Sequence, residues 1–500
     1  MNPSRITTES SDTPVSPQAG WWNSRTVILA LVLHGFLFLG LFSLSFEIEE
    51  WDRIKLAAKE QSIEAAAKII MQGHGLFGFV IWFYNSHGEE QLYYRYAKLT
   101  LSGEVDYWTK NKNLKIENER PWPYRDIPIE YQPGALLTLS LPGLFADNYK
   151  EYRFWLIAWF GFLYLLNLFL GIKLVTGGTP TTVQMNRLLW WSLAFLVLLG
   201  GIVTSRFDHI VVTCILLSTL VFGHALRKKG KQALIGFALF GFVTSIGVMT
   251  KIVPGLILIS ALLILLLNHK QTPRWADAFA SVTGLGVGLV FLNAGFYAIF
   301  GPGYWESFTY HMDRGIQLES VYAGLLLLAQ MAGLAIVTFE KSFGSSNVVS
   351  SLTGVVKLIS PFLFLGILVV LVRRVWHYSL PEGKAEEPGH FICSQIILLT
   401  LILLLAFMLS NKVFSPQYMI WVGPLMAVLV AVHKNMWKIG MMFLIASAMT
   451  QGIFPHLYEF LNQFHPAMVI LLNLRNALLI IILIMLIRDL PKLLEKNHSS

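Results

Sequence analysis

Long apolar runs alternate with short polar loops along the 500 residues of this chain. Residues 155–172 and 391–409, for example, contain no charged side chain. A helix of about 20 apolar residues crosses the hydrocarbon core of a bilayer. The pattern therefore predicts an all-α, multi-pass membrane protein with about twelve transmembrane helices. We expect these helices near residues 26–46, 153–175, 187–204, 207–226, 232–249, 252–267, 275–300, 352–372, 391–410, 418–432, 436–454 and 466–487.

Basic residues cluster in the short loops between the apolar runs, as at 227–231 and 373–384. Cytoplasmic loops carry an excess of lysine and arginine, so we expect these loops and both termini in the cytoplasm. The polar N-terminus, residues 1–25, is predicted to be disordered, and residues 488–500 form a cytoplasmic tail. The run at 26–46 is longer than a signal-peptide core and lacks a small-residue cleavage site, which indicates an uncleaved signal anchor.

The opposite side of the membrane then receives a large outer loop, residues 47–152. Within it, residues 54–71 have apolar side chains at helical spacing with lysines between them, which is typical of an amphipathic interfacial helix. Residues 135–145 are apolar but too short to cross. Residues 322–337 could span, but counting them would move the basic loop at Arg373 to the outside. We expect that segment to be re-entrant or to lie along the outer surface.

Composition narrows the class further. The chain is 55% hydrophobic and only 14% charged, whereas soluble domains are about 25% charged. The net charge of +8 comes from loops between spans, so it indicates membrane topology and no nucleic-acid partner. Cys214 and Cys393 lie in apolar runs, where they are expected to pack as small side chains.

Two polar islands sit between these apolar runs, at residues 124–134 and 205–209. Charged side chains next to lipid are costly, so they usually pair, face a cavity or take part in chemistry. Arg125 and Asp126 could form a structural ion pair, or bind a phosphate and a sugar hydroxyl. Arg206 and Asp208 could equally cap and anchor the next helix.

Other candidates lie in the outer segments. Glu89 and Tyr93 are four residues apart and would share a helix face; a carboxylate among aromatic rings can act as a general base, although a solvated surface acid is the alternative. Lys251, Arg314 and Glu319 could be solvated loop charges. Arg475 lies within an apolar run, where it needs a partner or extends to the interface. Together these groups suit a lipid-linked phosphate and the deprotonation of a hydroxyl.

The order of these residues resembles the family 87 glycosyltransferases, polytopic enzymes of the GT-C fold. The resemblance covers most of residues 26–487, with short and degenerate motifs. In the first outer loop it rests on an acid, a tyrosine four residues later, a Tyr-Ala pair, a glycine, a Pro-Tyr-Arg-Asp motif and a Glu-Tyr-Gln-Pro motif. These are Glu89, Tyr93, Tyr96-Ala97, Gly103, Pro123-Tyr124-Arg125-Asp126 and Glu130-Tyr131-Gln132-Pro133-Gly134. Further matches are Ser205-Arg206-Phe207-Asp208, the turn from Lys251 to Pro254, Arg314 with Glu319-Ser320, and Ser415-Pro416-Gln417-Tyr418 with Trp421.

The resemblance implies transfer of a hexose, such as mannose, or a pentose from a polyprenyl-phosphate donor to a glycan or glycolipid acceptor. It places the active site on the extracytoplasmic face of the plasma (inner) membrane. The implied base is Glu89, with Asp126 and Glu130 as alternates. The implied phosphate-binding cations are Arg125, Arg206, Lys251, Arg314 and Arg475. The implied substrate-binding residues are Tyr93, Tyr124, Asp208, Glu319, Gln417 and Tyr418.

Three departures from the family pattern stand out. Glu89 replaces an aspartate, Gln132 replaces a proline, and residues 106–120 form an insertion. A monophosphate donor has no obligatory metal, so we expect neither metal nor cofactor. A transporter or lipid flippase also needs many helices and intramembrane charges, and an inactive membrane scaffold is a third alternative.

Overall fold

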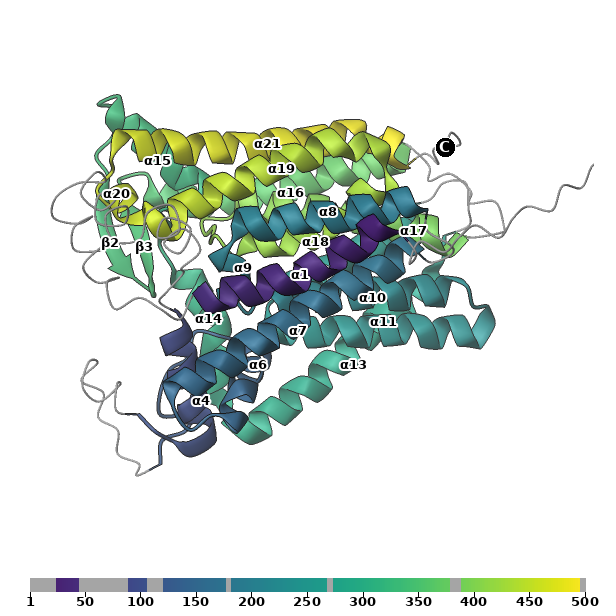
Figure 1. Ribbon diagram of the computed structural model, residues 1–500, viewed down its shortest axis with the longest axis horizontal. Coiled ribbons are helices and arrows are strands. Elements are labelled where there is room, and N and C mark those ends of the chain that lie inside the picture. The colour runs from purple at the N-terminus through teal and green to yellow at the C-terminus, as the bar shows by residue number, and fades with distance from the viewer. Residues whose placement is uncertain are drawn as a thin grey trace, which may run out of the picture.

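The structure, a computed structural model, describes residues 24–44, 89–105, 120–176, 181–267, 273–377 and 388–494. The predictions for residues 1–23, the amphipathic helix at 54–71, the insertion at 106–119 and the end of the tail at 495–500 fall outside the described residues. Within them, Figure 1 shows long helices packed side by side in one bundle, with shorter helices and a small sheet gathered at one end.

Every segment that the sequence predicted to span the membrane is helical. The corresponding helices are α1 (Arg25–Leu44), α7 (Tyr149–Thr176), α8 (Thr182–Leu199), α10 (His209–Leu226), α11 (Gly230–Thr250), α12 (Leu256–Leu266), α13 (Trp275–Phe300), α16 (Thr353–His377), α17 (Pro388–Ser410), α18 (Tyr418–Val432), α19 (Trp437–Gln451) and α21 (Pro466–Leu494). Among the described residues, nine helices are long and apolar enough to cross a membrane. The described apolar parts of α1, α12 and α18 are shorter.

The remaining elements lie at one end of the bundle, the end that the sequence predicts to face outward (the outer end). They are α4 (Glu89–Ser102), α6 (Pro133–Ser140), η2 (Leu141–Phe145), α9 (Gly201–Ser205), η3 (Val253–Gly255), η4 (Pro302–Trp305), α14 (Glu306–Asp313), α15 (Val321–Met331), the turn Gly452–His456 and α20 (Tyr458–Asn462). The other end has η5 (Lys434–Met436). At 1.5 Å per residue, α6 and α15 are too short to cross a bilayer. This agrees with the expectation for residues 135–145 and 322–337.

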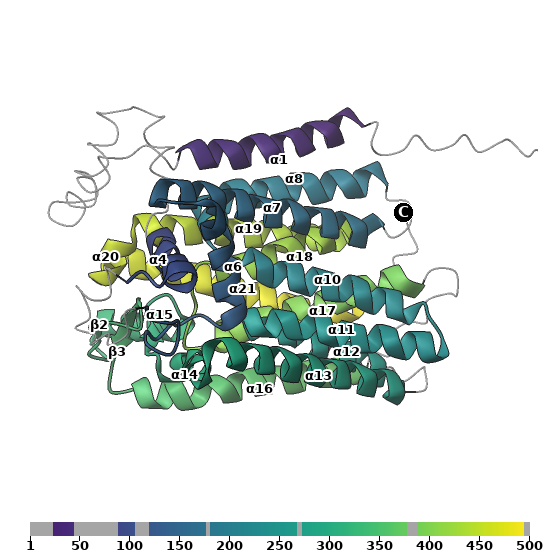
Figure 2. The ribbon, with the colours of Figure 1, turned by 90° about the horizontal axis from the view of Figure 1, so that it is seen from below.

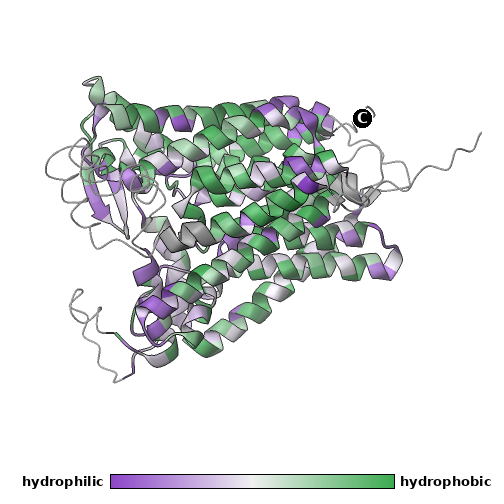
Figure 3. Ribbon diagram, in the orientation of Figure 1, coloured by the Kyte–Doolittle hydropathy of each residue, from purple (hydrophilic) through white to green (hydrophobic). Residues whose placement is uncertain are grey.

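Burial sorts the long helices into a centre and a periphery. The apolar stretch of α17 is 94% buried, whereas those of α13 and α16 are only 17% and 11% buried. Figure 2 shows α1 and α16 at opposite edges of the bundle, and Figure 3 shows hydrophobic residues along the helices' length. Such extensive apolar exposure is suited to lipid and not to water. The protein is therefore embedded in a membrane.

A three-stranded antiparallel sheet departs from the all-helical prediction. Its strands are β1 (Ile316–Gln317), β2 (Thr338–Ser342) and β3 (Ser345–Val349), in the order β1-β3-β2. β2 and β3 form a hairpin in which Thr338 pairs with Val349. No sequence pattern marked this hairpin, because its strands are short and its two-residue turn has phenylalanine where glycine or asparagine is usual.

Small residues allow α11 and α13 to pack with their backbones in close contact. A Cβ atom on Gly284 would fall on the backbone carbonyl of Ala238, and one on Gly241 would fall on the carbonyl of Ser281. Glycine at such crossings lets two membrane helices touch through their backbones.

We expect Gly284→Ala to force α11 and α13 apart and to lower stability by about 1–3 kcal/mol. The control is Gly286→Ala on the same helix, where an added Cβ meets nothing within 4 Å. Thermal unfolding of both purified variants in nanodiscs checks this. Equal melting temperatures would contradict the close crossing.

Candidate active site

A cavity of about 350 Å³ opens where the outer elements meet the ends of the bundle helices. Of the residues singled out in the sequence, eight line it: Glu89, Glu130, Arg206, Lys251, Arg314, Glu319, Gln417 and Tyr418. Its volume lies at the lower end of the range of about 300–1,000 Å³ usual for small-molecule sites. Residues more than 300 positions apart in the chain thus share one cavity.

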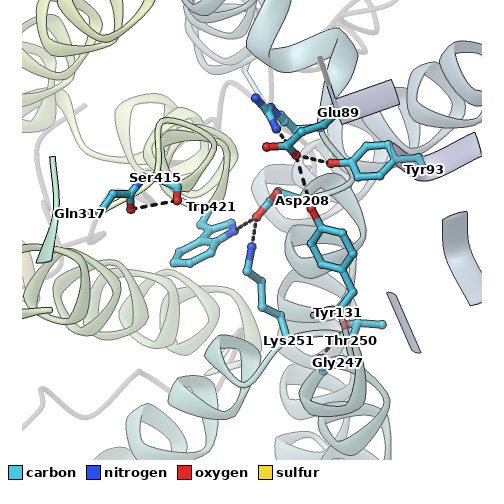
Figure 4. Close-up of polar contacts among 11 residues, drawn as sticks. Glu89, Tyr93, Tyr131, Asp208, Gly247, Thr250, Lys251, Gln317, Ser415 and Trp421 are labelled. Carbon is cyan, nitrogen blue, oxygen red and sulfur yellow. Dashed lines mark hydrogen bonds and ion pairs between the residues drawn. The ribbon is translucent and has the colours of Figure 1, made fainter. Parts of the chain in front are cut away.

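Glu89 lies at the first position of α4, with its side chain 33% exposed toward the cavity. Its Oε2 atom accepts hydrogen bonds from the hydroxyls of Tyr93 (2.8 Å) and Tyr131 (3.5 Å), as Figure 4 shows. Arg206 forms an ion pair with the same carboxylate. The positive end of the helix dipole adds to these contacts in stabilising the anion. These contacts therefore fix the direction of the Glu89 carboxylate.

Asp208 and Lys251 form the floor of this region. Lys251 Nζ lies 2.7 Å from Asp208 Oδ1, and the indole Nε1 of Trp421 donates to the same oxygen at 2.6 Å (Figure 4). The ammonium also lies 4.9–5.2 Å from the ring centroids of Phe207, Tyr418 and Trp421. Asp208 occupies the N-cap position of α10 but does not cap it. Its carboxylate instead forms the ion pair with Lys251, which neutralises the charge of the ammonium.

A second charged group lies under the wall of the cavity. Glu319 is fully buried, and Ser320 caps α15 beside it by accepting a hydrogen bond from the backbone N–H of Ala323. The guanidinium of Arg475 donates to the Glu319 carbonyl at 3.0 Å and lies 4.2 Å from the centroid of the Phe414 ring. Burial raises the pKa of the Glu319 carboxyl to about 8, although Arg475 and Arg206 favour its ionised form. The Glu319 carbonyl is thus a partner of the kind that Arg475 was predicted to need within its apolar run.

The Arg125–Asp126 motif lies apart from the cavity lining. Asp126 Oδ2 accepts from the backbone N–H of Trp122 at 2.6 Å, and the exposed Arg125 pairs with Asp126 at 3.0 Å. Tyr124, at φ +64°, donates its hydroxyl to the Tyr131 carbonyl at 2.6 Å. These contacts close the loop on itself and so present Glu130 and Tyr131 to the cavity. In this arrangement Arg125, Asp126 and Tyr124 hold the loop in shape.

The structure adds residues that the sequence did not single out. Tyr310 on α14 donates to Glu130 Oε2 at 2.8 Å, and Phe343 at the hairpin turn lines the cavity beside it. Tyr458 and Glu459 on α20 also line it. No sequence pattern marked the hairpin, and Tyr310 could only have been found through its partner Glu130. In the described part of the chain, no group of three or more His, Cys, Asp or Glu side chains is arranged to hold a metal ion.

No protein-family model, curated protein or solved structure matches this chain.

Removing one partner of the Lys251–Asp208 pair leaves an uncompensated buried charge, which typically costs about 3–5 kcal/mol. We expect Asp208→Asn to lower the melting temperature strongly. The double variant Asp208→Asn/Lys251→Met, in which no charge is stranded, should recover part of the loss. Thermal unfolding of the two variants in nanodiscs checks this, and a double variant less stable than the single one would show that the pair is not coupled.

Glu319 should make stability depend on pH. Because its pKa is about 8 in the folded protein and 4.5 ordinarily, the folded state binds the proton more tightly than the unfolded state. The stabilisation is complete below about pH 4.5 and is lost as the pH rises through about 8. We expect the melting temperature to fall from pH 6 to pH 9. Glu319→Gln should flatten this slope, and an unchanged slope would assign the dependence to another group.

Proposed function

We propose that this membrane protein is a glycosyltransferase that moves a sugar from a polyprenyl-phosphate donor to an acceptor hydroxyl. The observation that carries this proposal is the joint placement of an oriented carboxylate, Glu89, the buried guanidinium of Arg206 and the half-buried guanidinium of Arg314 in one cavity at the end of the helix bundle. The resemblance to family 87 glycosyltransferases points to the same chemistry. The cavity's position suits a substrate whose lipid tail stays in the bilayer while its head group is handled outside the hydrocarbon core.

In the proposed reaction the acceptor oxygen attacks the anomeric carbon of the donor sugar. The new C–O bond forms as the bond from the anomeric carbon to the phosphate oxygen breaks, and the electron pair leaves with polyprenyl phosphate. Glu89 takes the proton from the acceptor hydroxyl. A positioned base of this kind contributes about 10²–10⁴-fold in rate. Tyr93 and Tyr131 keep its carboxylate aimed at the attacking oxygen.

Arg206 links donor binding to the basicity of Glu89. In the structure its guanidinium pairs with the Glu89 carboxylate and lies 5.3 Å from the centroid of the Phe454 ring. An arriving phosphate competes for the same guanidinium, since forked donors bind phosphate oxygens well. Drawing Arg206 toward the phosphate frees Glu89 to accept a proton. Arg314, whose Nε atom has no hydrogen-bond partner among the described residues, is a second cation for the leaving group.

The other cations take supporting roles in this proposal. Lys251 is neutralised by Asp208 and fixes the floor, and Arg475 compensates Glu319 beneath the wall. Gln417 and Tyr418, at the start of α18, offer polar contacts to the sugar. The proposed site faces the outside of a plasma membrane, as the basic-loop distribution favours. The reaction needs no metal, because the leaving group is a single phosphate ester.

The alternative of a transporter or lipid flippase is less well supported. Transporter sites usually lie near the bilayer midplane, between broken helices of two repeats. Here the lining residues come from helix ends, such as Lys251 after α11 and Gln417 before α18, and from the outer elements.

Transfer of radiolabelled mannose from polyprenyl-phosphate mannose by membranes containing the protein tests the proposal. We expect Glu89→Gln to lower the transfer rate by about 10²–10⁴-fold, because the amide cannot take the proton. The matched control is Glu104→Gln, just beyond α4, where the side chain is 60% exposed and contacts Lys98 and Ser102 at the surface.

Two further variants separate the candidate bases. Asp126→Asn should act mainly on stability, since its carboxylate holds the loop, and Glu130→Gln should act on acceptor use. If Asp126→Asn abolishes sugar transfer while Glu89→Gln retains it, the catalytic base is Asp126 and not Glu89. If the wild-type protein transfers no sugar from a panel of polyprenyl-phosphate hexoses and pentoses, the proposed function is wrong.

A further inference from the structure

The tip of the β2–β3 hairpin places an aromatic ring in the cavity at a strained backbone position. Phe343 and Gly344 form the two-residue turn, with φ of +53° and +63°. Turns with both central residues at positive φ favour asparagine followed by glycine. A bulky residue with positive φ is unusual and strained. Strain of this kind persists where a side chain is kept for another purpose.

Glu130 lies against the same turn. A Cβ atom on Gly344 would come within 3.3 Å of Glu130 Oε2, so glycine permits this approach. That oxygen accepts the Tyr310 hydroxyl at 2.8 Å, and the Tyr310 ring lies edge-on to Phe343 with the centroids 5.2 Å apart. Within the described part of the chain, Glu130 Oε1 makes no hydrogen bond. The turn, α14 and the loop before α6 thus join a half-buried aromatic ring to a carboxylate with one oxygen available.

We propose that Phe343, Glu130 and Tyr310 form a binding subsite for the acceptor sugar, and that its ligand class is a pyranoside. The C–H face of a pyranose ring is apolar and packs on an aromatic ring, while its hydroxyls need polar partners at the edge. Phe343 supplies the ring, and Glu130 Oε1 accepts a hydroxyl. The hairpin lies at the outer end of the molecule (Figure 1), which is where an acceptor from outside the membrane would enter. The role of this sugar as the acceptor rests on the proposed function, whereas sugar binding at this turn does not.

The first test is saturation-transfer NMR with methyl α-D-mannopyranoside and methyl β-D-glucopyranoside, using the full chain in nanodiscs free of sugar detergents. The decisive variant is Phe343→Asn, because asparagine suits the turn. We expect its melting temperature to equal or exceed that of the wild type, while glycoside binding weakens about tenfold or more, the effect of losing one good aromatic contact. Glu130→Gln should also weaken binding. The control is Phe339→Ala on the same hairpin, whose ring is 41% exposed and does not line the cavity.

Equal binding by wild type and Phe343→Asn, or no glycoside binding by the wild type, would overturn the subsite. A transfer assay separates this failure from failure of the proposed function. If the protein transfers sugar, Phe343→Asn should raise the acceptor KM about tenfold and leave the donor KM unchanged; a change in kcat alone would contradict a binding role. If the protein transfers no sugar but binds glycosides through Phe343, the proposed function falls and the subsite stands.

Discussion

The ion pair between Lys251 and Asp208 is the contact on which the arrangement of the cavity depends. It joins the end of α11 to the start of α10, and the indole of Trp421 ties α18 to the same carboxylate. Three helices are therefore fixed at one point. Charges this close to the hydrocarbon core are tolerated only when they are paired. The neighbouring Arg206 and Phe207 are positioned by this contact, since they lie two residues and one residue before Asp208.

The same requirement for pairing organises the rest of the charged groups. Arg206 neutralises Glu89, Arg475 lies beneath Glu319, and Arg153 pairs with Glu90 at 2.9 Å between α7 and α4. In the proposed reaction, a donor phosphate that binds Arg206 competes with Glu89 for the guanidinium, so donor binding changes the environment of the Glu89 carboxylate. The need to pair charges near lipid would thus link donor binding to the basicity of Glu89.

The sequence predicted the membrane helices well because the signal is physical and local. A run of about 20 apolar residues has few alternatives in a bilayer. The helices within 135–145 and 322–337 are too short to cross a bilayer, in agreement with the expectation from length. The hairpin at 338–349 was not anticipated. Its strands are short, and Phe343 in the turn contradicts the usual residue preference, so no local pattern marked it.

The sequence predicted part of the cavity lining but not the contacts among its residues. Glu89, Arg206, Lys251 and Glu319 were recognisable as costly charges at one interface, and the structure brings them together. The sequence could not show that Asp126 is engaged by the Trp122 backbone, because that contact depends on the fold of the loop. Nor could it pair Tyr310 with Glu130, which lie 180 positions apart.

The glycine crossing of α11 and α13 has a mechanical consequence for the site. Because the two helices touch backbone to backbone at Gly241 and Gly284, they can tilt only as one body. A change in bilayer thickness is usually absorbed by helix tilt, and here that tilt would be carried by α13, which lies largely in contact with lipid, together with α11. Lys251 caps the end of α11. The position of Lys251, and with it the cavity floor, is therefore coupled to a pair of helices of which one faces lipid.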